Sequence, residues 1–338
     1  MILFDRCPST LKLGYDTYSP AALRKLFKGK KVSPMLPFLP PEKDEHVQEL
    51  FMENRKRFSI SGVQKKLLLV LEKNKLRLTN AGEVGQYILK PIPDDVKKTD
   101  QVPANEHLTM QLAEQVFNIY TAANGLIFFQ DGQPAYITRR FDIKQDGKKY
   151  KVEDFSSLAQ KTAETAGADF KYVGSVEMLF LTLQKYVGAY KVEAGKLFRL
   201  VLFNYIFSNG DAHLKNFSLM QTDDGDYLLS PAYDLLCSRL HVDDSDLAFK
   251  NGLFEGDFET ESFKANGFYA YDDFYELGLK VGLPEPIVKH EIQLFSTFEK
   301  EVERLIGLSF LNEEMKNDYL KLYQDKLKRV RYSFLKRV

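Results

Sequence analysis

Three side chains able to do acid–base or metal chemistry lie close together in the segment Ser208–Phe217, which reads Ser-Asn-Gly-Asp-Ala-His-Leu-Lys-Asn-Phe. They are Asp211, His213 and Asn216. Enzymatic phosphoryl transfer to a hydroxyl uses a carboxylate that accepts the hydroxyl proton and an amide oxygen that binds metal, in the spacing Asp-x-x-x-x-Asn. Asp211 and Asn216 have this spacing. The segment predicts a catalytic loop, although a surface turn with a helix C-cap at Asn209-Gly210 would explain the same residues.

A second carboxylate follows this loop. Asp234 lies in Pro231-Ala-Tyr-Asp-Leu-Leu, directly after a short strand predicted at Tyr227–Ser230. Aspartate is rarely buried unless it is paired or binds a metal, so its position among apolar residues indicates a functional group. A base, an amide ligand and a downstream carboxylate would form the magnesium–ATP part of a kinase site.

A lysine and a glutamate upstream fit the other part of such a site. Lys90 lies in a strand predicted from Gln86-Tyr-Ile-Leu-Lys, where it either extends its amine to solvent or holds the phosphates of ATP. Glu106 lies in the first turn of a helix that we expect to be capped by Asn105. This carboxylate either interacts with the helix dipole or forms an ion pair with Lys90.

The elements that must position these residues predict an α+β chain with a two-lobed protein-kinase-like fold. A proline-rich segment at 1–57, with short helices at 21–27 and 42–57, should pack on the remainder. A small β-rich N-lobe is expected at 58–141, with the hinge between lobes at its end. Within it, the apolar strand that ends at Leu71 should form a hairpin with Lys75–Leu78. A larger α-helical C-lobe is expected at 142–338. Its predicted helices are 152–166, 175–190, 193–207, 272–281, 284–305 and 312–337.

Composition limits the choice of function. The chain has 338 residues, enough for two lobes, and its 47 basic and 47 acidic residues give no net charge that would favour nucleic acid. Two cysteines suit a reducing compartment. No signal-peptide pattern and no apolar run of membrane-spanning length occurs in the sequence. We therefore expect a cytoplasmic protein with no membrane partner.

Six motifs, in order, resemble the HipA family of bacterial toxin serine/threonine kinases. They are Ser59-Ile-Ser-Gly-Val-Gln64, Ile88-Leu-Lys90, Asn105-Glu106-His107, Arg140-Phe-Asp142, Asp211-Ala-His-Leu-Lys-Asn216 and Tyr233-Asp234. Full-length HipA carries an additional N-terminal subdomain. The chain has only a short segment there and looks more like the short HipT type, in which a separate small HipS-type protein supplies that subdomain.

The resemblance implies a role for each matching residue, with ATP and Mg²⁺ as cofactors. Asp211 would be the catalytic base, and Asn216 and Asp234 the metal ligands. The nucleotide would be bound by Lys90, by the phosphate loop Ser61, Gly62, Val63, Gln64, Lys65 and Lys66, by the hinge Arg139, Arg140 and Phe141, and by His213 and Lys215. Glu106 would pair with Lys90, and Ser59 and Ser61 match serines that these kinases autophosphorylate.

The resemblance also implies partners. The family phosphorylates aminoacyl-tRNA synthetases and halts translation, and HipB-type helix-turn-helix antitoxins bind it, so DNA would be contacted only through the antitoxin. Two alternatives stay open. The segment from Asn209 to Asn216 also resembles the catalytic loop of aminoglycoside phosphotransferases, which are small-molecule kinases. The other is a non-catalytic ATP-binding subunit of an antitoxin–DNA complex.

The order of the motif residues along the chain also departs from the usual kinase pattern, since His213 follows Asp211 and Tyr-Asp replaces Asp-Phe-Gly.

Overall fold

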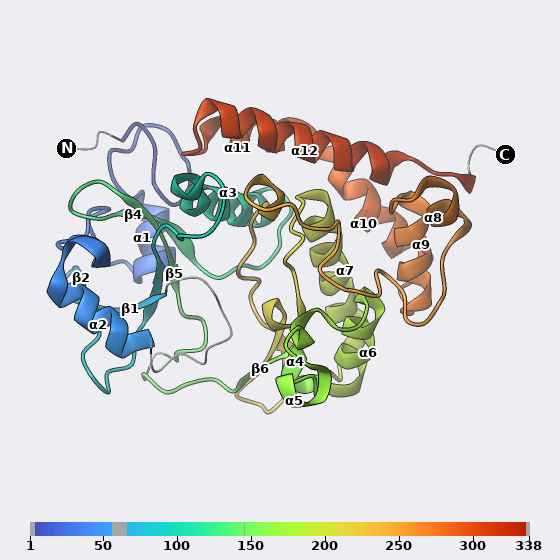
Figure 1. Ribbon diagram of the computed structural model, residues 1–338, viewed down its shortest axis with the longest axis horizontal. Coiled ribbons are helices and arrows are strands. Elements are labelled where there is room, and N and C mark those ends of the chain that lie inside the picture. Colours follow the sequence, from blue (N-terminus) through green and yellow to red (C-terminus); the bar gives the residue numbers. More distant parts are fainter. Residues whose placement is uncertain (1–3, 56–65, 145, 336–338) are drawn as a thin grey trace. The chain divides into compact units, whose positions relative to one another are not determined.

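The computed structural model describes residues 4–55, 66–144 and 146–335. Its elements are labelled in Figure 1. The chain divides into two compact units. Unit 1 comprises residues 1–111, 122–149 and 307–316, and unit 2 comprises 112–121, 150–306 and 317–338. The predicted mixture of helices and strands is confirmed, with most of the strands in unit 1 and most of the helices in unit 2.

An antiparallel sheet forms the centre of unit 1. In the described residues its strand order is β2-β1-β3-β5-β4. The predicted hairpin of β1 and β2 is confirmed, and Lys90 at the end of β3 lies opposite Tyr136 of β5. The strands are β1 Leu67–Glu72, β2 Lys75–Leu78, β3 Tyr87–Lys90, β4 Asn124–Phe128 and β5 Pro134–Arg139.

The chain before β1 packs on this sheet. Helix α1 (Pro20–Phe27) begins as predicted, because Ser19 caps it by accepting a hydrogen bond from the Ala22 N–H at 3.2 Å. Phe27 and Tyr18 belong to the same buried cluster as residues of the strands. The helix predicted at 42–57 is shorter, since a 3₁₀ turn precedes α2 (Glu45–Arg55).

Helix α3 (Val102–Gln115) starts earlier than predicted. The expected N-cap at Asn105 is wrong, because Pro103 occupies the first turn of the helix, where a proline costs no hydrogen bond. Asn105 instead accepts a hydrogen bond from the Thr109 hydroxyl at its carbonyl oxygen, at 2.9 Å. Glu106 therefore lies beyond the first turn, so a capping role no longer explains it.

The predicted helix at 152–166 is wrong. Val152–Asp154 forms strand β6, which pairs with β7 (Ser218–Gln221) in a second sheet ordered β6-β7-β8, with β8 at Tyr227–Leu229. Two single-turn helices follow, α4 (Phe155–Leu158) and α5 (Ala163–Ala166). Periodicity within the segment gave no information on its pairing with a strand far along the chain.

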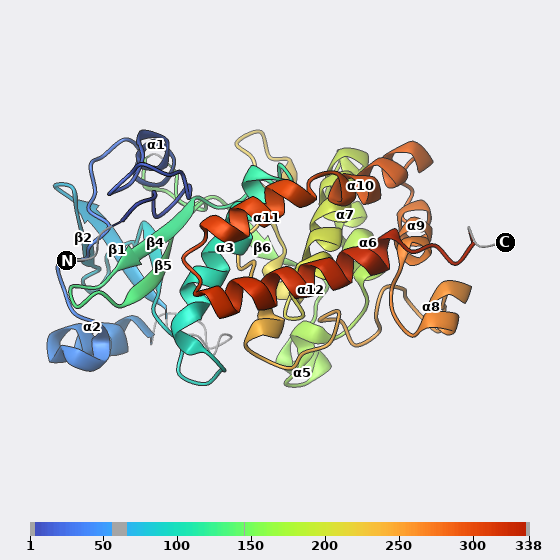
Figure 2. The same cartoon turned by 90° about the horizontal axis from the view of Figure 1, so that it is seen from above.

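Longer helices make up most of unit 2. Helix α7 contacts both α6 and α10, and α10 contacts α9, as Figure 2 shows. The helix predicted at 284–305 is divided at Phe298 into α10 and α11. In the described residues no helix is both long enough and apolar enough to cross a bilayer. The helices are α6 Val176–Tyr186, α7 Tyr190–Ile206, α8 Glu261–Asn266, α9 Tyr271–Lys280, α10 Glu285–Thr297, α11 Glu299–Leu308 and α12 Glu313–Arg331.

Candidate active site

The candidate catalytic loop connects α7 to β7 in unit 2. Helix α7 ends at Ile206, and Ser208 turns the chain with a φ of 51°. The Asn209 side chain then donates a hydrogen bond to Asn204 Oδ1 at 2.9 Å, which ties the loop back to the helix. A 3₁₀ turn at Leu214–Asn216 leads into β7. Buried elements thus hold the loop at both ends.

Gly210 lies where no larger residue fits. Its N–H donates to Ser238 Oγ at 2.8 Å. A Cβ atom at this position would lie 2.6 Å from a carboxylate oxygen of Asp244, closer than unbonded atoms approach. Burial raises the pKa of this Asp244 carboxyl above its ordinary value. The segment that carries Asp244 therefore sets the path of the backbone just before Asp211.

Asp211 receives a hydrogen bond that the sequence did not indicate. The Tyr172 hydroxyl donates to Asp211 Oδ1 at 2.7 Å. Burial, and then the hydrogen bond to Asp211 and its charge, raise the pKa of Tyr172 above its ordinary value, so the phenol keeps its proton and acts as the donor. The Asp211 side chain is 49% exposed and remains accessible to a reactant. No motif or spacing in the sequence connects Tyr172 with the loop.

His213 is held neutral beside this carboxylate. Burial lowers the pKa of His213 to about 4, against the opposing charge of Asp211. Its Nε2 lies 4.0 Å from Asp211 Oδ1, too far for a hydrogen bond. Its ring packs edge-on against Tyr172 with centroids 5.2 Å apart. Within the described residues its buried Nδ1 has no hydrogen-bond partner. His213 is thus an uncharged polar group at neutral pH.

Asn216 joins the loop to Asp234. Its Oδ1 accepts a hydrogen bond from the His213 N–H at 3.1 Å, and its Nδ2 donates to Asp234 Oδ2 at 3.2 Å. Asp234 has a φ of 61°, a conformation that costs free energy for a residue with a side chain. Strain of this kind often accompanies functional positions. The structure therefore brings Asn216 and Asp234 together at the loop that carries Asp211.

The donor set at Asn216 and Asp234 fits magnesium. Both side chains offer hard oxygen atoms, and Mg²⁺ characteristically takes one or two protein carboxylates and completes its octahedron with water and substrate phosphates. Across the described residues, no group of three or more His, Cys, Asp or Glu side chains could hold a metal alone.

Lys90 and Glu106 form a buried ion pair in unit 1. Lys90 Nζ lies 2.6 Å from Glu106 Oε1, and the two side chains are only 6% and 2% exposed. The Lys90 amine also lies 5.4 Å from the ring centroid of Tyr136, its neighbour across the sheet. The Glu106 carboxylate therefore holds the amine at one place, and an ammonium group has three N–H donors, so contact with Glu106 does not by itself prevent contact with an anion.

The remaining candidate residues are less closely defined. In the expected hinge, the N–H groups of Arg139 and Arg140 donate to Ala123 O and Gln86 O within unit 1, at 2.8 and 2.9 Å. Lys215 Nζ lies 5.9 Å from the ring centroid of Phe170 in unit 2. Ser59, Ser61, Gly62, Val63, Gln64 and Lys65 lie outside the described residues, and Lys66 directly precedes β1.

Two solved structures share this fold. A chain of the Shewanella oneidensis MR-1 toxin–antitoxin complex of HipA, HipB and operator DNA matches 80% of this chain with a TM-score of 0.60 and 21% identity. The match covers 64% of that chain. The Helicobacter pylori proinflammatory kinase CtkA matches 78% of this chain, and 93% of its own, with a TM-score of 0.51 and 13% identity.

Sequence relatives carry kinase names. A Haemophilus influenzae protein named "Putative kinase" is 26% identical over 325 residues, which cover 92% of this chain and 91% of the relative. A Sinorhizobium fredii protein of similar name, Y4mE, is 30% identical over 202 residues but is covered for only 44% of its length. The family model described as "HipA-like C-terminal domain" matches residues 58–301. The chain belongs to the family of proteins with this HipA-like C-terminal domain.

Proposed function

We propose that the chain is a serine/threonine protein kinase that transfers the γ-phosphate of ATP. The observation that carries this proposal is the convergence of an amide and a carboxylate, Asn216 and Asp234, at the loop of a half-exposed Asp211. These are the residue types that kinase chemistry uses as metal ligands and base, in the matching chain order. The kinase names of the relatives support the same class of reaction.

Asp211 would accept the proton of the acceptor hydroxyl. Tyr172 holds its Oδ1, and among the described residues its Oδ2 has no hydrogen-bond partner, so one oxygen is left to receive a proton. Asn216 and Asp234 would hold magnesium, which would neutralise phosphate charge. Lys90, oriented by Glu106, would hold the phosphates of ATP.

The other roles follow from the family resemblance. His213 and Lys215 would lie at the nucleotide, residues 139–141 would recognise adenine and Ser61–Lys66 would cover the phosphates. Because the N–H groups of Arg139 and Arg140 already donate within unit 1, adenine recognition there would rely on other backbone groups. Autophosphorylation of Ser59 and Ser61 would control activity.

We further propose the arrangement and setting of a short HipT-type toxin. The segment 1–57, the N-lobe 58–141 and the C-lobe 142–338 would form the two-lobed kinase fold. In the short type that the resemblance suggests, a HipS-type protein would supply the additional N-terminal subdomain. That chain was solved with HipB and DNA, which supports a HipB-type antitoxin as partner. An aminoacyl-tRNA synthetase would be the substrate, in the cytoplasm.

Replacing the base tests the proposal. Asp211→Asn should lower phosphoryl transfer from radiolabelled ATP by about 10²–10⁴-fold while nucleotide affinity persists, because only proton transfer is removed. Asp234→Ala should instead weaken Mg·ATP binding in a calorimetric titration. Wild-type protein that binds but never turns over ATP would favour a non-catalytic subunit, and transfer to aminoglycosides but not to proteins would favour a small-molecule kinase.

A further inference from the structure

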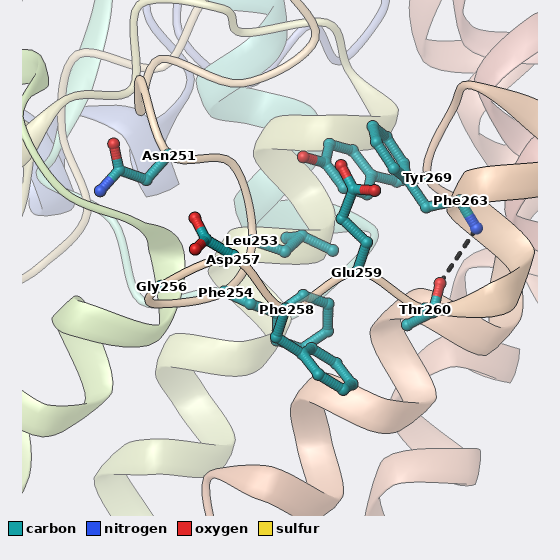
Figure 3. Close-up of a pocket in the computed structure, with 10 residues that line it drawn as sticks. All are labelled: Asn251, Leu253, Phe254, Gly256, Asp257, Phe258, Glu259, Thr260, Phe263 and Tyr269. Atoms are coloured by element: carbon teal, nitrogen blue, oxygen red, sulfur yellow. Dashed lines mark hydrogen bonds between the residues drawn. The ribbon is translucent and has the colours of Figure 1, made fainter.

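A pocket in unit 2 has no part in the proposed phosphoryl transfer. Its volume is about 390 Å³, within the range of ligand sites. It is lined by Asn251, Leu253, Phe254, Gly256, Asp257, Phe258, Glu259, Thr260, Phe263 and Tyr269 (Figure 3). Two aromatic pairs form much of its wall. Phe254 and Phe258 pack edge-on with centroids 4.9 Å apart, and Phe263 stacks on Tyr269 at 4.6 Å. The pocket thus presents several ring faces and edges.

Negative charge accompanies these rings. Asp257 and Glu259 also line the pocket, and both are exposed. In the described residues neither carboxylate takes part in an ion pair or hydrogen bond. The rings already attract a cation, because Lys280 Nζ lies 5.4 and 4.9 Å from the centroids of Phe254 and Phe258. The charge of Lys280 is offset by Glu177 at 2.9 Å. Aromatic faces combined with unpaired carboxylates suit a lysine or arginine side chain.

Backbone hydrogen bonds connect this pocket to the candidate base. The Lys250 N–H donates to Tyr172 O at 3.0 Å, and the Asn251 N–H donates to Gly174 O at 3.1 Å. The chain that begins the pocket wall is thus paired with the chain that carries Tyr172. The Tyr172 hydroxyl in turn contacts Asp211. The pocket therefore belongs to the same loop system as the residue that would receive the acceptor hydroxyl.

We propose that this pocket binds a lysine or arginine side chain of the polypeptide acceptor. A basic residue near the phosphorylated serine or threonine is then a specificity determinant. The inference rests on the proposed kinase function and adds a substrate class to it. Charge complementarity with Asp257 and Glu259 selects a cation, and the rings contribute cation–π attraction.

Peptide phosphorylation measures the preference. A set of peptides with one central serine carries arginine, lysine, glutamine or glutamate at each flanking position in turn. We expect at least one position where a basic residue raises kcat/KM about tenfold, equivalent to about 1.4 kcal/mol. The double variant Asp257→Asn/Glu259→Gln should lose that preference while kcat for neutral peptides stays unchanged. The double variant Asp226→Asn/Glu261→Gln removes two exposed charges of unit 2 that lie outside the pocket. This control variant should keep the preference for a basic residue. The inference is overturned if the wild type shows no preference for a basic residue. It is also overturned if Asp257→Asn/Glu259→Gln leaves that preference unchanged.

A binding measurement separates this inference from the kinase proposal. An alanine-based peptide with one arginine and no serine or threonine is titrated into isotope-labelled protein, beside the same peptide with glutamine. Amide resonances of residues 251–263 should shift only with the arginine peptide, and Phe258→Ala should abolish the shifts. No localised shift in a protein that phosphorylates peptides refutes the pocket alone. Localised shifts in a protein that transfers no phosphate refute the kinase proposal alone.

Discussion

The buried ion pair of Lys90 and Glu106 gives the most quantitative prediction. Both partners are almost inaccessible to solvent at 6% and 2% exposure, and their charged atoms are 2.6 Å apart. Removing one charge takes away the ion-pair partner of the other in a low-dielectric site, which costs about 3–5 kcal/mol. Lys90→Met and Glu106→Leu should each lower the free energy of unfolding by about this amount. The double variant should be much less destabilised than the sum of the two single losses, because neither buried charge of the pair remains.

Denaturant unfolding measures the effect. The chain has no tryptophan and 18 tyrosines, so tyrosine fluorescence and far-ultraviolet circular dichroism are the probes. A matched control in unit 1 is Glu314→Gln, which breaks the 2.8 Å ion pair with Lys98. Those side chains are 71% and 36% exposed, so the loss should stay below about 1 kcal/mol.

Two results would refute the reasoning on this ion pair. Single variants no more destabilised than the surface control would show that the pair is not shielded from water. A double variant destabilised by the full sum of the single losses would show that the two charges do not interact, since additivity marks independent sites.

Three further predictions test other parts of the structure. Tyr172→Phe should lower kcat about tenfold with an unchanged KM for ATP, because it removes one hydrogen bond to the Asp211 carboxylate and keeps the ring. A higher kcat would mean that the Tyr172 hydroxyl competes with the acceptor hydroxyl for Asp211. Burial lowers the pKa of His107 from 6.5 to about 4, so the unfolded chain binds more protons between these values. Stability is therefore complete above pH 6.5 and declines toward pH 4, by at most about 3 kcal/mol from this residue, and unfolding of His107→Leu across that range should show a weaker pH dependence. Gly210→Ala should displace the candidate catalytic loop and abolish ATP turnover, whereas retained turnover would show that the loop tolerates a Cβ atom there.

Local signals account for what the sequence predicted well. The start of α1 follows from the Ser19-Pro20 pair, since a cap and a first-turn proline act within a few residues. The β1–β2 hairpin follows in the same way from two short apolar runs with a turn between them. The spacing of Asp211 and Asn216 is likewise local, and a buried helix and strand at its two ends hold the loop in place.

Other features depend on contacts between distant segments, and these were mispredicted or missed. Val152–Asp154 is a strand only because it pairs with Ser218–Met220. The break at Phe298 has no glycine or proline beside it, so local signals gave no reason to divide that helix. The early start of α3 shows the limit of cap signals too, since Asn105 was a good candidate but Pro103 already lay inside the helix.

By itself, the sequence determined which residue types are present and how they are spaced, and from these the class of chemistry. Only the tertiary structure decided that Lys90 and Glu106 form an ion pair buried from solvent, that Tyr172 donates to Asp211, and that residues between 251 and 269 line an aromatic, acidic pocket. The physical reason is the separation along the chain over which each kind of interaction acts. Caps, turns and motif spacings act over a few residues, whereas burial and hydrogen bonds between distant residues arise only when folding brings those segments together.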